Sequence, residues 1–385
     1  AASEEDSEFF AIGPFDAVAV IDHQPTRPLS YDRELKNRAG QIADASGLEA
    51  FREWGRPVPK KLVGRDDIFA LSVWKVESDP QPVPLALQNS VIAHSVPGIV
   101  PKFAGRDTEL IIDFGRELSG YISFEVEAPA GAVLDWYGFE YMRDGWRQDT
   151  FGLDNTVRYV ARAGRQSYTS PVRRGLRYLM LTVRNADKPV KLHRVQMIQS
   201  NFPVAEIGRF QSSDALLNDI WEISKHTTRL CMEDTFVDCP SYEQVFWVGD
   251  SRNEAIVNYY VFGADEIVRR CLKLVPGSRT ETPLYMDQVP SGWSSVIPNW
   301  TFFWAIACRE YYEHTGDRSF AAEMWPHVRY TLDHYLQRID ERGLLNIRGW
   351  NLLDWAPIDQ PNNGVVTHQN AFLVKTLRSA AALAE

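Results

Sequence analysis

The residues best suited to do chemistry in this chain lie between positions 238 and 250. The stretch reads DCPSYEQVFWVGD and contains three carboxylates, Asp238, Glu243 and Asp250, but no lysine or arginine. Carboxyl groups that crowd one another without a cation raise one another's pKa. A carboxylic acid that keeps its proton near neutral pH can protonate a leaving glycosidic oxygen, as glycoside hydrolysis requires. Trp247 could keep water from such an acid, and it could also stack on the face of a sugar.

The same acids also have a purely structural interpretation. Acidic residues before and at the beginning of a helix accept hydrogen bonds from its free N–H groups and interact favourably with its dipole. Asp250 could cap a helix that begins with SRNEAIVNYY. Residue types and spacing therefore leave two interpretations open, an acid–base site and an ordinary helix N-terminus.

The elements before these acids have the period of β-strands. In YISFEVEAP, the apolar residues Ile122, Phe124 and Val126 alternate with polar ones, which predicts a half-buried strand. A Pro-Ala-Gly turn then precedes another strand, and YLMLTVRNADKPVKLHRVQMI contains two apolar runs separated by a polar turn. Short strands with frequent turns predict a β-sandwich.

After about residue 204 the period becomes helical. Ser213 is a candidate cap for a first helix, whose apolar positions 216, 220, 223, 227 and 230 share one face. At a later break, Gly316 suits the end of one helix and Asp317 the cap of the next. Helices joined by short turns predict a bundle or a closed α/α barrel. Further helices are predicted at 250–262, 264–275, 299–314, 318–337 and 368–384.

These patterns predict a multi-domain protein of the β + α class. Residues 1–90 form a partial N-terminal region that we expect to be rich in β-structure with short helices. Residues 91–203 form a β-sandwich domain, and residues 204–385 form part of a helical barrel. A closed double ring would need about twice the six predicted helices, and the chain stops within an Ala-rich helix, LRSAAALAE. We therefore expect a longer parent chain or a partner chain to supply the rest of the barrel.

The pattern D-C-P-x-x-E-x-x-x-W-x-G-D resembles the signature of the α-L-rhamnosidases of glycoside hydrolase family 78. IIDFGRELSGYISFEV resembles the strand pair before the barrel of those enzymes, and VPSGWSSVIPNW, EHTGDRSF and NLLDWAP resemble later barrel segments. The resemblance covers about residues 90–385. It implies β-sandwich material followed by the first half of an (α/α)6 barrel.

The resemblance also implies roles for individual residues. Glu243 would be the general acid that protonates the leaving oxygen of a terminal α-L-rhamnoside. Asp238 and Asp250 would bind rhamnose hydroxyls and help to hold the proton on Glu243. The sugar subsite would be lined by three tryptophans, Trp247, Trp293 and Trp355.

Family members invert the anomeric configuration, which requires a second carboxylate to activate water. In the family this base is a Glu of the later barrel, beyond residue 385. The available residues Glu254, Glu281, Glu310 and Glu313 are expected on helix surfaces or loops. Tyr242 replaces an arginine of the family pattern and Phe246 often replaces a glycine, so both put the identity of the substrate in doubt.

The remaining composition narrows the classes of partner. The net charge is −10, and without a stripe of lysine and arginine we expect no nucleic-acid partner. No apolar run approaches the roughly 20 residues of a membrane span, so no membrane partner is expected. The four cysteines form no C-x-x-C pair and the histidines are scattered, so we expect no metal and no cofactor. The chain begins without the regions of a signal peptide, and the compartment, cytoplasmic or secreted, stays open.

Two other functions compete with rhamnoside hydrolysis. A sugar-binding homologue without hydrolytic activity would explain the missing base and the changes at Tyr242 and Phe246. An α/α-barrel glycosidase of different sugar specificity would keep the fold and change the substrate.

Overall fold

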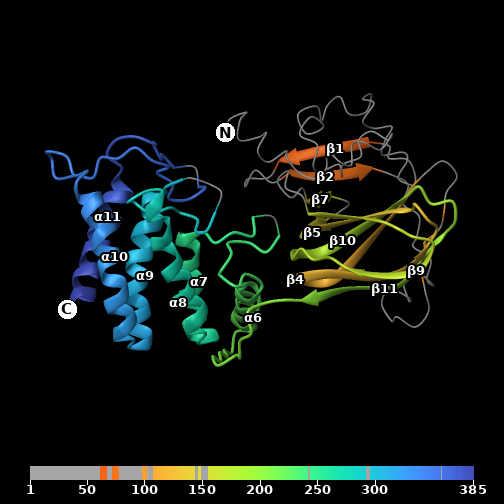
Figure 1. Cartoon of the computed structure of the whole chain (residues 1–385), viewed down its shortest axis with the longest axis horizontal. Coiled ribbons are helices and arrows are strands. Elements are labelled where there is room, and N and C mark those ends of the chain that lie inside the picture. The colour runs from red at the N-terminus through yellow and green to blue at the C-terminus, as the bar shows by residue number, and fades with distance from the viewer. Residues whose placement is uncertain are drawn as a thin grey trace. The chain divides into compact units, whose positions relative to one another are not determined.

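The structure is a computed structural model. It describes residues 61–66, 72–77, 98–100, 102, 107–143, 146–148, 155–241, 243–291, 295–356 and 358–385. The chain divides into two compact units, residues 1–200 with 240–242, and residues 201–239 with 243–385 (Figure 1). Most of the predicted N-terminal region, 1–90, lies outside the described residues. The three predicted domains with their boundaries therefore stay a proposal.

Antiparallel sheets make up the described part of the first unit. The smaller sheet has the order β1 (Lys61–Asp66), β2 (Ser72–Glu77), β7 (Trp146–Gln148), β6 (Met142–Arg143). In the larger sheet, β9 (Gly164–Thr169) pairs with β4 beside an ordered path of six strands. This path runs β3 (Gly98–Val100), β11 (Val190–Gln199), β4 (Thr108–Ala128), β10 (Arg174–Arg184), β5 (Val133–Phe139), β8 (Thr156–Val160).

Strand β4 organises the larger sheet because its two halves pair with different neighbours. Its first half pairs with β10, and its second half pairs with β11 and β9. The alternation predicted from sequence is confirmed, since Ile122, Phe124 and Val126 are fully buried. The Phe124 ring stacks on Trp136 of β5 with 4.7 Å between ring centroids. The apolar face of these strands therefore forms the core of this unit.

The second unit is helical, as its sequence period predicts. Helix α9 lies at its centre, where it packs against α7, α8, α10 and α11. These five helices lie side by side (Figure 1). None of the described helices is both long and apolar enough to cross a membrane. The helices are α6 (Ala215–Leu230), α7 (Val248–Val261), α8 (Asp265–Leu274), α9 (Pro298–Thr315), α10 (Arg318–Leu336) and α11 (Thr367–Ala384), with a 3-10 turn η3 (Val275–Thr280) after α8.

The junction between α9 and α10 forms as its sequence predicts. Gly316 ends α9 in the left-handed conformation, with φ of 68°, and its N–H donates to Tyr312 O at 2.8 Å. Asp317 caps α10, because its carboxylate accepts a hydrogen bond from Phe320 N at 3.0 Å. The two helices can therefore turn back on each other through two residues.

Helix α6 departs from the prediction in its cap. The capping residue is Asp214 and not Ser213, because the Asp214 carboxylate accepts from Leu216 N at 2.9 Å. A carboxylate is a stronger acceptor than a hydroxyl, and its charge suits the positive end of the helix.

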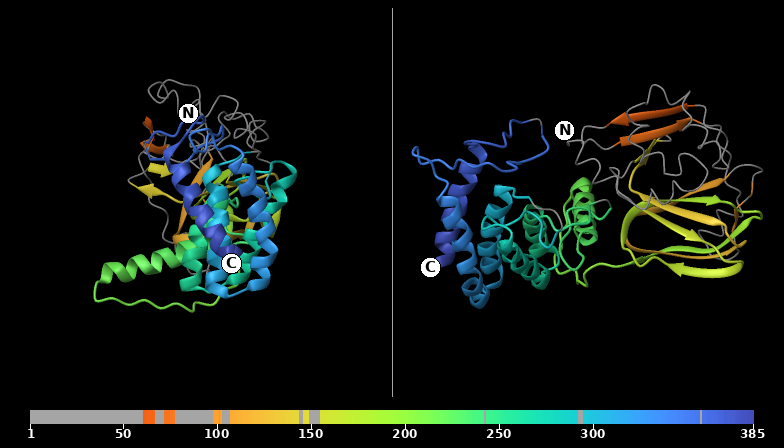
Figure 2. Two further views of the ribbon diagram at one scale, coloured as in Figure 1. Left: turned by 90° about the vertical axis from the view of Figure 1, so that its left-hand side faces the viewer. Right: turned by 45° about the horizontal axis from the view of Figure 1, so that its top comes forward.

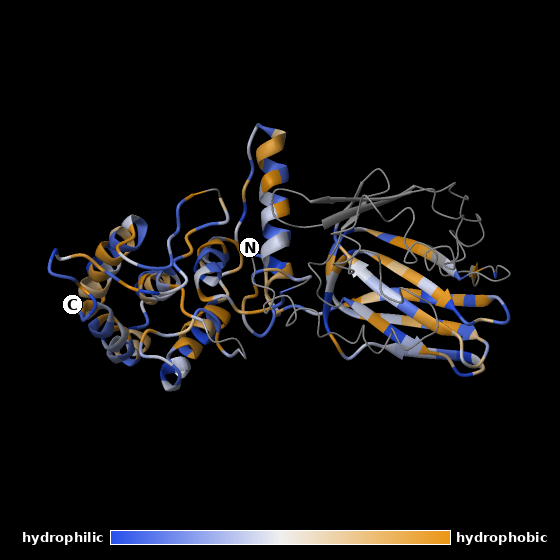
Figure 3. Ribbon diagram, turned by 90° about the horizontal axis from the view of Figure 1, so that it is seen from above, coloured by the Kyte–Doolittle hydropathy of each residue, from blue (hydrophilic) through white to orange (hydrophobic). Residues whose placement is uncertain are grey.

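The predicted apolar face of α6 is exposed along most of its length, and its last position, Leu230, is buried. Leu216, Ile220 and Ile223 retain 64%, 49% and 68% of their accessible surface, and apolar residues follow the helix in Figure 3. The helix runs at a large angle to α7–α11 (Figure 2). Its amphipathic sequence predicted the helix correctly but not its burial.

We predict that Gly316→Ala lowers the free energy of unfolding of the helical unit by about 1 kcal/mol, because a Cβ disfavours the left-handed backbone. The added methyl group has open space around it, so the loss comes from the backbone alone. Urea unfolding followed by helical circular dichroism measures it. Gly277→Ala is the matched control, since its surroundings are also open and its φ is ordinary. Equal effects of the two substitutions would contradict this explanation.

Candidate active site

The loop from Asp238 to Trp247 closes on itself and leads into α7. Asp238 N donates to Val245 O at 3.1 Å, and Gln244 N donates to Cys239 O at 3.2 Å. Gln244 has φ of 54°, which turns the chain back at this point. The loop therefore brings Asp238 and Glu243, five positions apart in sequence, to neighbouring places.

The helix itself begins earlier than the sequence suggests. Trp247 is the residue before its first turn and makes no side-chain cap, while Val248 N donates to Asp287 O at 2.8 Å. Asp250 is therefore a residue of the first turn, and its prediction as the helix cap is wrong. A backbone carbonyl replaces a capping side chain here, which leaves the Asp250 carboxyl available for other contacts.

Glu243 is exposed and is held by two neighbours. The indole Nε1 of Trp247 donates to Glu243 Oε2 at 2.5 Å, and the Glu243 backbone N–H donates to Cys239 Sγ at 3.3 Å. An indole N–H can only donate, so Oε2 is the accepting oxygen of this carboxyl group. A proton on Glu243 therefore belongs on Oε1, the oxygen that the indole leaves available.

The carboxyl groups around Glu243 retain protons more strongly than usual. The pKa of Asp238 is raised from its ordinary value of 3.8 to about 9, first by burial and then by Glu243, with which it also shares a hydrogen bond. The pKa of Asp250 is raised from 3.8 to about 6, mainly by burial and further by Glu243. The cluster therefore holds at least one proton beside Glu243 at neutral pH.

Glu254 belongs to the same cluster, and its prediction as a surface residue is wrong. It follows Asp250 by four positions on α7, so the two side chains share one face. Its Oε2 is buried without a hydrogen-bond partner among the described residues. Burial, and then the charges of Asp250 and Asp238, raise the pKa of Glu254 well above its ordinary range. The four-residue spacing was the signal in the sequence that could have identified it.

Close packing of two helices explains why position 249 of the motif is a glycine. A Cβ built on this glycine would lie 2.4 Å from the ring of Trp300, at the beginning of α9. Any side chain at position 249 would push the two helices apart. The absence of a side chain therefore allows α7 and α9 to approach each other beside Asp250.

Three tryptophans lie in a row that starts at the acid. The rings of Trp247 and Trp350 meet edge to face with 6.0 Å between centroids, and those of Trp350 and Trp355 do the same at 6.1 Å. Trp355 retains 75% of its accessible surface. Trp293, the other predicted subsite residue, lies outside the described residues. Trp350 was missed in the sequence, which offers no spacing that relates it to Trp247.

A cation could be considered where Asp238, Cys239 and Glu243 bring one ligand atom each to within 4.8 Å of one another. A cation needs deprotonated ligands, and burial raises the pKa of both Asp238 and the Cys239 thiol, so a cation would have to displace protons from both groups. The donor set therefore suits proton transfer better than metal binding.

Comparison with known proteins identifies the class of domains. Three domain families of α-L-rhamnosidases match successive parts of the chain. Domain D2 of α-L-rhamnosidases matches residues 1–61, and the bacterial α-L-rhamnosidase concanavalin-like domain matches 104–199. The bacterial α-L-rhamnosidase 6 hairpin glycosidase domain matches 205–385, which contain the acids and tryptophans of the candidate active site.

Solved structures agree with these matches. The rhamnosidase of glycoside hydrolase family 78 from Bacillus sp. GL1 is 60% identical, with a TM-score of 0.78 over 94% of this chain and 38% of that one. A Klebsiella oxytoca rhamnosidase, solved with rhamnose bound, has the same fold at 22% identity, with a TM-score of 0.63 over 88% of this chain and 67% of that one. The chain therefore carries domains of the α-L-rhamnosidase families and resembles the rhamnosidases of glycoside hydrolase family 78 over most of its length.

The chain spans only part of its relatives. A curated α-L-rhamnosidase of Formosa agariphila is 23% identical over 278 residues, which are 66% of this chain and 29% of that protein. The predicted fold class, β-sandwich followed by part of an (α/α)6 barrel, is confirmed by the described sheets and helices together with these matches.

We predict that the helical unit becomes less stable as the pH rises from about 4 to about 9. In this window folded Asp238 keeps a proton that the unfolded chain releases, so the free energy of unfolding falls with pH. One such proton changes it by up to about 1.4 kcal/mol per pH unit. Asp238→Asn removes this proton and should make the fall less steep, with the raised pKa values of Asp250 and Glu254 causing the remainder, measured as urea midpoints at pH 5 and pH 8.

Asp234→Asn is the matched control for this experiment. Asp234 is an exposed carboxylate on the same segment, paired with Arg270 at 3.1 Å. Its replacement should leave the slope with pH as in the wild type. An Asp238→Asn variant with the wild-type slope would show that Asp238 is ionised in the folded protein.

Proposed function

We propose that this protein is an inverting glycoside hydrolase that releases terminal α-L-rhamnose, with Glu243 as its general acid. The observation that carries this proposal is the arrangement around Glu243, an exposed carboxyl group that a tryptophan orients and buried acids surround. The α-L-rhamnosidases that the chain resembles supply the class of substrate. The 60% identity to the Bacillus enzyme supports the same chemistry.

The proton comes from the carboxyl cluster in this mechanism. The indole of Trp247 engages Glu243 Oε2, which leaves Oε1 to present the proton to the glycosidic oxygen. As the bond to the leaving group breaks, the oxygen takes that proton and Glu243 becomes a carboxylate. Exposed Glu243 takes up a new proton from solvent for the next turnover, while buried Asp238 keeps its own proton and its hydrogen bond to Glu243.

The remaining site residues bind the sugar in this proposal. Asp238 and Asp250 offer oxygens to the hydroxyl groups of rhamnose. Trp247 and Trp355 offer flat apolar faces to the ring, and Trp293 has the same proposed role. The substrate partner is a rhamnose-containing glycoside.

Inversion requires a base about 6.5–9.5 Å from the acid. We propose that this base is a Glu of the later barrel, outside the 385 residues. The helices α6–α11 of the described residues are six in number, whereas the matching domain is named for six hairpins, so a complete domain has further hairpins. A longer parent chain or a partner chain would supply the others. "The completed protein" denotes this chain with those hairpins.

We predict that Glu243→Gln in the completed protein lowers turnover of alkyl or glycosyl α-L-rhamnosides by about 10²–10⁴-fold, because these leaving groups need a proton. A dinitrophenyl α-L-rhamnoside leaves without protonation, so its turnover should fall far less. Steady-state rates on both substrates measure the difference.

Other results would favour the competing functions. Equal rates of the variant and the wild type on both substrates would show that Glu243 is not the general acid. Binding of L-rhamnose without turnover would favour a sugar-binding homologue. Turnover of a different terminal sugar, with the same dependence on Glu243, would keep the mechanism and change the specificity.

A further inference from the structure

Trp350 is linked to the proposed acid, Glu243, through the side chain of Trp247. It lies on the long segment between α10 and α11, and its ring packs against the Trp247 indole, with an angle of 72° between the planes. That indole donates the hydrogen bond to Glu243 Oε2. The backbone of Trp247 is already fixed by a bridge to Gln288. The rotation of the indole about its own bonds depends on what packs against the ring.

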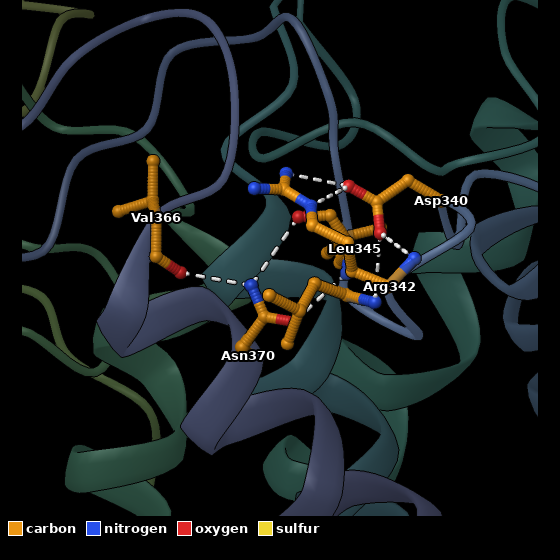
Figure 4. Close-up of polar contacts among 6 residues, drawn as sticks. Asp340, Arg342, Leu345, Val366 and Asn370 are labelled. Carbon is orange, nitrogen blue, oxygen red and sulfur yellow. Dashed lines mark hydrogen bonds and ion pairs between the residues drawn. The ribbon is translucent and has the colours of Figure 1, made fainter.

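The base of the segment that carries Trp350 is closed by side-chain hydrogen bonds (Figure 4). Asn370 of α11 accepts from Leu345 N at 2.8 Å and donates to Leu345 O at 3.2 Å and Val366 O at 3.0 Å. The Asp340 carboxylate accepts from the backbone and guanidinium of Arg342, which closes a turn. The two ends of the segment are therefore held together.

A second group of bonds holds the part next to Trp350. Gln369 is fully buried and donates to Asn351 Oδ1 at 2.6 Å, and Asn351 Nδ2 donates to Pro361 O at 2.8 Å. Asn299, fully buried at the beginning of α9, donates to Leu352 O at 2.9 Å.

The Trp350 backbone N–H itself donates to Val296 O at 3.2 Å. Buried amide side chains of α9 and α11 thus set the position of the residues that follow Trp350. Because hydrogen bonds hold the backbone of Trp350 and the residues that follow it, the Trp350 ring has a defined place against Trp247.

We propose that Trp350 is a positioning residue of the acid site. It holds the Trp247 indole in the orientation in which its N–H meets Glu243, and Gln369 acts through Trp350 by fixing Asn351. This inference rests on the proposed role of Glu243 as the acid. The indole decides which carboxyl oxygen accepts a bond, so a free indole would let the proton occupy either oxygen. Protonation of the leaving group would then become inefficient.

The test uses the completed protein and two α-L-rhamnosides. Trp350→Ala should lower kcat for an alkyl rhamnoside by about 10–100-fold, since misplacing a catalytic group by about 1 Å can cost that much. It should lower kcat for a dinitrophenyl rhamnoside by less than about 3-fold, because that leaving group needs no acid. A merely structural role of Trp350 would lower both rates equally, which would overturn the proposal.

Two control variants test whether any loss of activity comes from unfolding or from the removal of any tryptophan of the helical unit. Trp350→Phe keeps an aromatic ring at this place and should retain most of the activity on the alkyl substrate. Trp325→Phe of α10 changes a partly buried tryptophan of the same core and should leave both rates unchanged. Wild-type rates of Trp350→Ala on both substrates would also overturn the proposal.

A double-mutant cycle tests the route from Gln369. Gln369→Leu removes the donor to Asn351 and should reproduce the selective loss on the alkyl substrate. In the Trp350→Ala background it should add little, because the contact that it supports is already gone. Additive effects would show that Gln369 acts by another route.

Failure of this proposal can be told from failure of the proposed function. If Glu243→Gln shows no dependence on the leaving group, the acid is misassigned. If Glu243→Gln shows that dependence and Trp350→Ala does not, the acid stands and only the positioning role falls.

Discussion

The removal of carboxyl groups from water at the beginning of α7 is the constraint on which the site depends. Asp238, Asp250 and Glu254 all have raised pKa values, and burial is the largest cause for each. Water would otherwise stabilise their charges, so the fold keeps protons where a solvated cluster would lose them. Groups whose pKa is raised in the folded state lower the free energy of unfolding as the pH rises, so keeping these protons costs stability at high pH.

The loops that precede α7, α9 and α11 together support this carboxyl cluster. The loop before α7 bridges to the loop before α9 between Trp247 and Gln288. The loop before α11 reaches the same place through the bond from Trp350 N to Val296 O and the ring contact with Trp247. Helix α9 packs between α7 and α11, which brings these loops to one end of the unit. The site is therefore a property of helix packing and not of one motif.

Local sequence determined the elements and the acids. The two-residue period predicted β4, whose apolar residues are buried, and Gly316 and Asp317 predicted the junction of α9 and α10. The three acids from Asp238 to Asp250, with no lysine or arginine among them, indicated raised pKa values. These features depend on contacts within a few residues of the chain, and such contacts are readable from spacing alone.

Only the tertiary structure decided which distant residues join the acids. The row of rings from Trp247 through Trp350 depends on a segment about a hundred positions away in the sequence. The four-residue spacing places Glu254 on the same face of α7 as Asp250, but only the packing around α7 buries its carboxyl group. Helix α6 shows the opposite, because most of its apolar face is exposed although its sequence pattern is that of a buried face. Burial depends on what packs against a face. A periodic pattern predicts which residues share a face but not which element packs against it.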